Sequence, residues 1–146
     1  MSDQLDDFLK ELQGQIYEET LRDYGQKAFD RWIDPPCMHT MENPDAHGRI
    51  TGSCGDTMDI FLKFKEGTVS EASFTTDGCG PSMICGSLAA ELAIGNDPEE
   101  LKKITAETIL EVIGGLPEED QHCASLAANT LQMALFRYLD QETSGP

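Results

Sequence analysis

Three cysteines, one aspartate and one histidine are the residues of this sequence whose types and spacing suit a metal centre. One glycine separates Cys54 from Asp56, Cys79 lies between two glycines, and His122 is followed directly by Cys123. Thiolate and imidazole groups suit zinc or iron and are too soft for calcium or magnesium. These five side chains form the candidate set of metal ligands.

A predicted β-hairpin lies between the first two of these motifs. Apolar residues alternate with mostly polar ones over 58–64 and again over 72–76, a pattern typical of two strands joined by a turn. A three-residue loop at 66–68 sets Ile60 opposite Phe74, whereas a two-residue loop puts the two apolar sets on different faces. We therefore predict the three-residue loop.

The predicted register also brings the first cysteines together. Continued outward, it sets Asp56 opposite Gly78 and Gly55 opposite Cys79, all at one end of the hairpin. Opposed residues of a ladder have Cβ atoms about 5 Å apart. The thiols of Cys54 and Cys79 and the carboxylate of Asp56 are thus expected to converge on one ion.

Structural zinc binding, or burial of the cysteines without any metal, is the alternative interpretation, since free cysteine is among the most buried residue types. The sequence contains no pair of Cys-x-x-Cys motifs, which structural zinc sites commonly use, and a carboxylate among thiolates is unusual in a closed site. These features favour a site whose metal can exchange.

The remaining cysteines and histidines are expected to have other roles. Cys85 follows Cys79 by six residues, so on a helix it should point away from a ligand at the helix start and serve packing, with a redox or auxiliary-ligand role as the alternative. Cys37 and His39 form a Cys-x-His pair in a proline-containing loop, where a second metal clasp is less expected than ordinary surface residues. His47 is a still weaker ligand candidate.

The elements that must position these residues form one α+β domain. Apolar residues recur at three- and four-residue spacing from Leu5 to Tyr24, and helical patterns follow the hairpin as far as Leu139. A small antiparallel sheet, about three-stranded, with helices packed on one face is therefore predicted. The expected organisation is a single domain, 1–146, with an N-terminal helical region 1–36, a loop or arm 37–53 with one short strand near Ile50, a metal-site core 54–139 and a tail 140–146.

Composition excludes several classes of function. The 146 residues include 10 Lys plus Arg against 27 Asp plus Glu, a formal charge of -17, which phosphate would repel, so no nucleic-acid partner is expected. No stretch is apolar enough to span a membrane, and the acidic N-terminus is unlike a signal peptide. The five cysteines are accordingly expected to be thiols in the reducing cytoplasm.

Taken together, the motifs resemble those of the IscU/NifU N-terminal family of iron-sulfur cluster assembly scaffolds. The resemblance covers roughly Leu12 to Leu139. It rests on three ordered motifs: Cys54-Gly55-Asp56, Gly78-Cys79-Gly80 with the helix start after it, and Leu116-Pro117 leading to His122-Cys123.

The resemblance implies a role for each predicted ligand. Cys54, Cys79 and Cys123 would be the cluster thiolates, Cys123 would also accept persulfide sulfur, and Asp56 and His122 would be exchangeable fourth ligands. The cargo would be a transient [2Fe-2S] cluster built from iron, with zinc as an alternative occupant of the purified protein. The partners would be a cysteine desulfurase and apo iron-sulfur acceptor proteins, and the chain would be an assembly scaffold and not an enzyme.

Two features separate this chain from known branches of the family. Where the best-known members carry Leu-Pro-Pro-Val-Lys, a motif read by a dedicated Hsp70 chaperone, this chain has Leu116-Pro117-Glu118-Glu119-Asp120, so chaperone recognition is in doubt. The zinc-bound SufU-like sulfurtransferase accessories carry a long insertion between the second cysteine motif and the histidine, and none lies between Cys79 and His122. The scaffold is favoured over the SufU-like accessory and over a structural zinc-binding adaptor.

Overall fold

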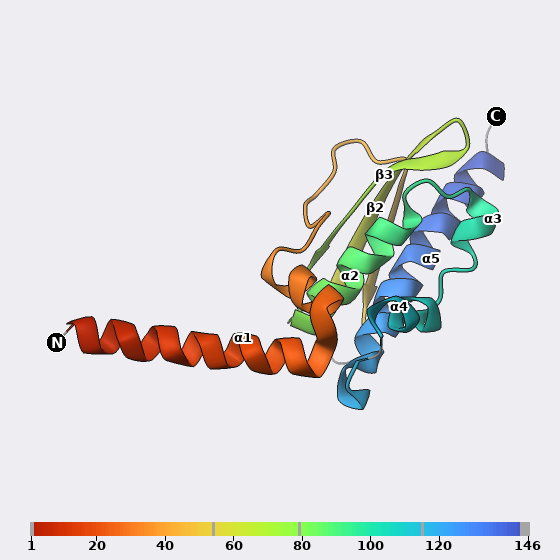
Figure 1. Ribbon diagram of the computed structural model, residues 1–146. Helices are drawn as coiled ribbons and strands as arrows, with labels where there is room; N and C mark the ends of the chain where they lie inside the picture. The colour runs from red at the N-terminus through yellow and green to blue at the C-terminus, as the bar shows by residue number, and fades with distance from the viewer. Residues whose placement is uncertain (1, 54, 79, 115, 144–146) are drawn as a thin grey trace.

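A computed structural model describes residues 2–53, 55–78, 80–114 and 116–143 of the chain. Three strands form one antiparallel sheet in the order β1-β2-β3, and helices α2 and α5 pack on one of its faces (Figure 1). The predicted α+β architecture is confirmed. In chain order the elements are α1 (Ser2–Ile33), β1 (Ala46–Thr51), β2 (Thr57–Lys65), β3 (Thr68–Thr76), α2 (Gly80–Ala93), α3 (Pro98–Leu101), α4 (Ala106–Ile113), the 3-10 turn η1 (Glu118–Asp120) and α5 (Gln121–Thr143).

The core register of the β2–β3 hairpin is the predicted one. Ile60 pairs with Phe74 and Leu62 pairs with Ala72, and all four side chains are buried. The alternation places these residues on the sheet face that α2 and α5 cover, which is why this register was the one compatible with a single apolar face.

The predicted three-residue loop at 66–68 is wrong. The strands are joined by two residues, Glu66 and Gly67, which both have positive φ values, 55° and 84°, as a two-residue hairpin turn of this twist requires. Because the register shifts between Lys63 and Phe64, β3 contains one residue more than β2 at this point. That extra residue compensates for the loop being one residue shorter than predicted. This β-bulge restores the pairing that buries the apolar side chains, so the register holds although the loop is shorter.

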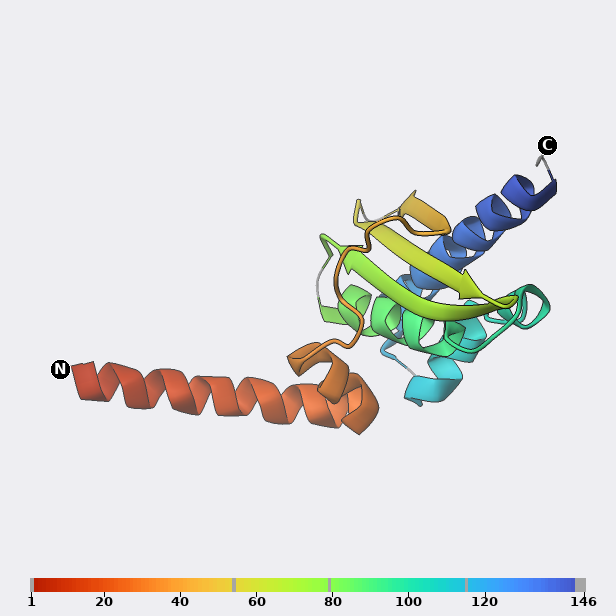
Figure 2. The same ribbon diagram turned by 90° about the horizontal axis from the view of Figure 1, so that it is seen from above.

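The first helix consists of two parts. Gly25 has a non-helical conformation, with φ 83° and ψ 174°, and divides α1 at that point. Before the break the helix extends away from the sheet and the other helices, and after it the chain turns back against α2 (Figures 1 and 2). The predicted helix is confirmed, but the apolar side chains of Leu5, Phe8, Leu9 and Leu12 near its start are exposed, Phe8 by 59%. No helix in the described ranges has the length and apolarity to cross a membrane.

The segment predicted as a loop or arm at 37–53 contributes both sheet edges. Its expected short strand is β1, in which Ile50 pairs with Met58 of β2. At the other edge, Phe74 of β3 donates its backbone N–H to the carbonyl of Cys37 at 2.8 Å, and Met38 forms a single parallel bridge with Phe74. The arm thus forms one edge strand of the sheet and pairs with the other edge strand.

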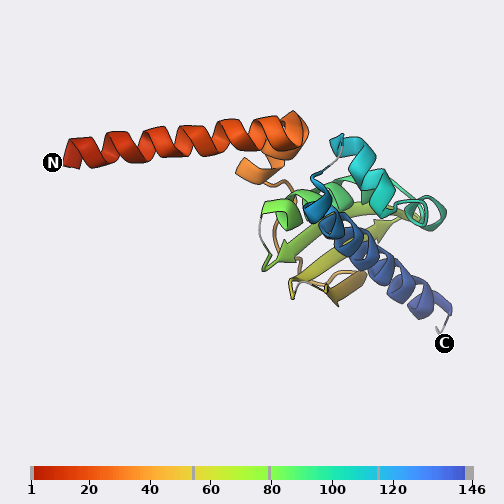
Figure 3. The same cartoon turned by 90° about the horizontal axis from the view of Figure 1, so that it is seen from below.

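Helix α5 runs across the sheet (Figure 3), and it approaches β1 so closely that only glycine fits between them. A Cβ on Gly48 would lie 2.4 Å from the carbonyl oxygen of Thr130 and 2.6 Å from the backbone nitrogen of Ala134. Both atoms belong to the helix backbone and cannot rotate away. The contact fixes the position of α5 across the sheet, and with it the place where the first turn of α5 lies.

We expect Gly48→Ala to destabilise the protein by about 1–3 kcal/mol, because the added methyl group forces the helix and the strand apart. The measurement is urea unfolding followed by circular dichroism. Gly52→Ala is the matched control, since a Cβ there meets side-chain atoms of Leu126 at 3.5 Å, an ordinary contact distance. Equal unfolding midpoints for the two variants would contradict this account of the α5–β1 contact.

Candidate metal centre

The carboxylate of the candidate centre lies in a tight turn between β1 and β2. The backbone N–H of Gly52 donates to the carbonyl of Asp56 at 2.8 Å, and the N–H of Gly55 donates to the carbonyl of Gly52 at 3.0 Å. Gly55 has φ 92°, a conformation that residues with side chains rarely adopt. The glycines flanking position 54 therefore allow the turn that brings the half-buried Asp56 to this end of the sheet.

The histidine and the third cysteine lie in the first turn of α5. The Sγ of Cys123 is 3.6 Å from Nε2 of His122. Cys123 is 1% exposed, whereas His122 is exposed. The first turn of a long helix has unpaired N–H groups and a partial positive charge, which suits negatively charged ligands and cargo. The pair thus offers one buried sulfur and one solvent-accessible imidazole.

Ser82 of α2 joins the carboxylate to the thiol. Its hydroxyl donates to Oδ2 of Asp56 at 3.4 Å and lies 3.5 Å from Sγ of Cys123, and the residue is fully buried. The sequence analysis did not identify Ser82 as part of the site. The available signal was a small polar residue at a buried position in the first turn of a helix.

Gly78 lies against the same group, as the predicted register required. A Cβ at this position would be 2.6 Å from Oγ of Ser82 and 2.8 Å from Oδ2 of Asp56. The expectation that Asp56 and Gly78 face each other at the open end of the hairpin is confirmed. A side chain at position 78 would displace the carboxylate or the hydroxyl.

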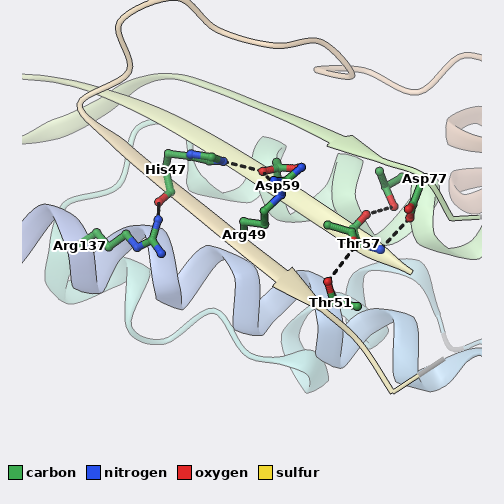
Figure 4. A network of polar contacts seen from close by, with 8 residues as sticks. His47, Arg49, Thr51, Thr57, Asp59, Asp77 and Arg137 are labelled. Atoms are coloured by element: carbon green, nitrogen blue, oxygen red, sulfur yellow. Dashed lines mark hydrogen bonds and ion pairs between the residues drawn. The ribbon is translucent and has the colours of Figure 1, made fainter. Parts of the chain in front are cut away.

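Polar contacts hold this end of the hairpin together (Figure 4). Thr57 donates its backbone N–H to Oδ1 of Asp77 at 2.7 Å, and its carbonyl accepts the hydroxyl of Thr76 at 2.9 Å. The same Thr76 hydroxyl oxygen accepts the N–H of Gly78 at 3.0 Å. Residues 76 and 77, which precede the second cysteine motif, are therefore joined by hydrogen bonds to Thr57, the residue that follows Asp56.

His47 belongs to a separate polar network on β1 and β2 (Figure 4). Its Nε2 is 2.6 Å from Oδ1 of Asp59, which also pairs with Nε of Arg49 at 3.2 Å. The imidazole stacks on the ring of Phe61, with centroids 4.6 Å apart. These contacts indicate that His47 stabilises the sheet and is not a metal ligand of the candidate centre.

Three of the five predicted ligands therefore lie at one end of the fold, namely Asp56, His122 and Cys123. The other two, Cys54 and Cys79, lie outside the described residues. Within the described ranges, no three His, Cys, Asp or Glu side chains form a metal-binding group. The full ligand set thus stays a prediction, to which the structure adds the placement of three members and of the residues beside them.

The structure separates the roles of the other cysteines. Cys85 is fully buried, and burial, followed by the charges of Cys123 and Asp120, raises the pKa of its thiol above the usual range. Its complete burial in the core agrees with the packing role expected from the sequence. Cys37 is half-buried, and burial and the charge of Glu91 raise its pKa as well.

The Cys-x-His pair at 37–39 does not form a metal clasp with its neighbours in the described part of the chain. Nδ1 of His39 lies 2.9 Å from the carbonyl oxygen of Thr40. The Cys37 carbonyl accepts hydrogen bonds from the backbone of His39 and Phe74. The pair shapes the arm at the β3 edge.

Comparison of the sequence with protein families and curated proteins gives consistent matches. Residues 23–144 match the model of the NifU-like N-terminal domain. The chain is 36% identical over 116 residues to the iron-sulfur cluster assembly scaffold protein IscU 1 of Archaeoglobus fulgidus, an alignment that covers 79% of this chain and 76% of the relative.

Solved structures share the fold at lower sequence identity. The N-terminal part of a nitrogen-fixing NifU-like protein from Brucella abortus superimposes with a TM-score of 0.64 at 18% identity, covering 84% of this chain and 97% of the other. The putative iron-sulfur cluster assembly scaffold protein for the SUF system from Fervidobacterium islandicum gives 0.62 at 20% identity, covering 80% and 98%. These likenesses support the architecture described above.

We expect Cys85 in the native metal-free protein to be alkylated by iodoacetamide at least about a hundredfold more slowly than Cys37 at pH 8, because the thiolate is the nucleophile and burial suppresses it. Raising the pH to 9 should speed labelling of Cys37, since its thiolate fraction rises towards the raised pKa, and should leave Cys85 unlabelled. Peptide mass spectrometry gives both rates. Denaturant should abolish the difference, and equal native rates would contradict the burial of Cys85.

Proposed function

The chain belongs to the NifU-like N-terminal domain family, and from that premise we propose that it is a scaffold for iron-sulfur cluster assembly. On this proposal it receives iron and desulfurase-derived sulfur, builds a [2Fe-2S] cluster and passes the cluster to apo-proteins. It works in the cytoplasm, where reducing conditions keep cysteines as thiols. Its partners are a cysteine desulfurase and apo iron-sulfur acceptor proteins.

The observation that carries the proposal is the convergence of a thiol, a carboxylate and an imidazole on one end of the fold. Asp56 comes from the β1–β2 turn and His122 and Cys123 from α5, and the buried Ser82 bridges them. Thiolate sulfur and imidazole nitrogen are established ligands of iron-sulfur clusters. The donors in the described residues fit this cargo, and Cys54 and Cys79 complete the proposed set.

Cys123 is the proposed acceptor of sulfur. Its thiolate attacks the outer sulfur of a persulfide carried by the desulfurase, so that a new S–S bond forms on Cys123 and the partner leaves as a thiolate. Cluster formation then needs two electrons from a reductant for each such sulfur, because the sulfane sulfur must become sulfide. The adjacent His122 is exposed, whereas Cys123 itself is 1% exposed, so the proposed transfer needs the thiol to become accessible when the partner binds.

Asp56 is proposed to make the cluster transferable. A carboxylate oxygen is a harder donor than a thiolate and matches the cluster less well. The Ser82 hydroxyl contacts the same carboxylate and competes with iron for it. A scaffold needs such a weak position, since its product must leave.

The altered chaperone motif is part of the folded domain. Leu116 is buried, its carbonyl accepts a hydrogen bond from the side chain of Gln121 at 3.2 Å, and residues Glu118–Asp120 form a 3-10 turn. The lysine of the usual motif is replaced by Asp120. We therefore propose that the dedicated Hsp70 chaperone, if it is a partner, binds this motif more weakly than the usual one.

Anaerobic reconstitution with iron and sulfide tests the proposal. A scaffold develops the visible charge-transfer bands of an iron-sulfur cluster and converts an apo-ferredoxin to its holo form. A colourless protein that keeps zinc and transfers no cluster would overturn the proposal in favour of the SufU-like accessory or the zinc-binding adaptor.

We predict that Cys54→Ser, Cys79→Ser and Cys123→Ser each lose most of the bound iron after reconstitution, because each removes one of the three proposed thiolates. Iron is counted per protein after gel filtration. Cys37→Ser and Cys85→Ser are the matched controls and should retain the iron of the parent protein. Parent-level iron in any of the first three would remove that cysteine from the proposed site.

Asp56→Ala should lengthen the lifetime of the bound cluster and slow its transfer, because His122 is positioned to take the fourth ligand site that the carboxylate leaves. The measured quantity is the half-time of transfer to apo-ferredoxin, with assembly yield recorded for both proteins. Faster loss of cluster from the variant would mean that Asp56 retains the cluster. Asp59→Asn, a change outside the proposed site, should leave the half-time unaltered.

A further inference from the structure

Trp32 packs on the start of α2, directly beside the second cysteine motif. A Cβ at Gly80 would lie 2.6 Å from Cδ1 and 2.7 Å from Nε1 of Trp32. The edge of the indole ring therefore lies directly on the backbone of Gly80, the residue that follows Cys79 in the sequence. Glycine is required there because any side chain would overlap the ring.

The part of α1 that carries Trp32 is anchored independently of this contact. Arg31 makes a two-pronged ion pair with Glu91 of α2, with Nε–Oε2 2.7 Å and Nη2–Oε1 2.9 Å. Ser87 donates to the carbonyl of Pro36 at 3.0 Å. These bonds tie Arg31 and Pro36, which precede and follow Trp32 in the sequence, to α2. The position of the indole therefore does not depend on Gly80 alone.

Gly78, on the other side of Cys79 in the sequence, is also in close contact with its neighbours. It packs against Asp56 and Ser82, and the hydroxyl of Thr76 accepts its N–H. The two glycines that flank Cys79 in the sequence therefore have different neighbours: Gly78 contacts the candidate centre, and Gly80 contacts Trp32.

We propose that Trp32 is a positioning residue of the scaffold: its indole packs on Gly80 and thereby helps to hold Cys79, the preceding residue in the sequence, at the cluster site. The inference rests on the proposed function. Loss of the ring gives Gly80 more freedom and admits water, so the cluster becomes shorter-lived and its surroundings change. Residues that support ligands in this way commonly change metal affinity by about 10–100-fold.

The test compares the parent with Trp32→Ala and Trp32→Phe after anaerobic reconstitution. We expect Trp32→Ala to shorten the cluster half-life against EDTA about tenfold or more and to alter the visible circular dichroism of the cluster. Trp32→Phe, which keeps an aromatic ring, should restore most of both. Phe8→Ala is the matched control, because Phe8 is an exposed aromatic residue of the same helix.

A double-mutant cycle with Gly80→Ala tests the contact in the metal-free protein. The added methyl group should lower the urea midpoint of the parent through overlap with the indole and have a much smaller effect in the Trp32→Ala background. Parent-like half-life and dichroism in Trp32→Ala, or equal effects of Gly80→Ala in both backgrounds, would overturn the inference. A parent that loads and transfers no cluster would instead overturn the proposed function, and with it the role of Trp32.

Discussion

The close passage of α5 over β1 is the constraint on which the site depends. Helix and strand meet backbone to backbone at Gly48, so the axis of α5 has little freedom to shift across the sheet. Because the interior of a protein is close-packed, such a contact fixes the distant end of the helix as well. That end carries His122 and Cys123, and the contact thus sets where the thiol lies relative to Asp56.

The two fully buried thiols among the described residues, Cys85 and Cys123, have different surroundings. Cys85 and Cys123 are both buried, but Cys123 lies beside an exposed histidine and a serine hydroxyl at the end of the fold. Cys85 is enclosed by the core, and its pKa is raised mainly by burial. Polar neighbours, and not the degree of burial, separate the proposed sulfur acceptor from the packing residue.

The two parts of α1 have different relations to the fold. The part after Gly25 is joined to α2 by the Arg31–Glu91 pair and by Trp32, and it lies within the residues that match the family model. Most of the part before Gly25 precedes those residues and extends from the domain, with the apolar side chains of Leu5, Phe8, Leu9 and Leu12 exposed. Contacts near the site therefore come from the second part, although the sequence predicted a single helical region over 1–36.

The sequence by itself determined the features that depend on local pattern. Alternation set the register of Ile60 and Phe74, because side-chain periodicity acts between near neighbours. The tertiary structure alone decided that a bulge compensates for a two-residue turn, that Ser82 bridges Asp56 and Cys123, and that Trp32 lies on Gly80. The contacts of Ser82 join residues that are 26 and 41 positions apart, and Trp32 and Gly80 are 48 positions apart. Their partners are selected by the packing of whole elements, which leaves no periodic signal in the chain.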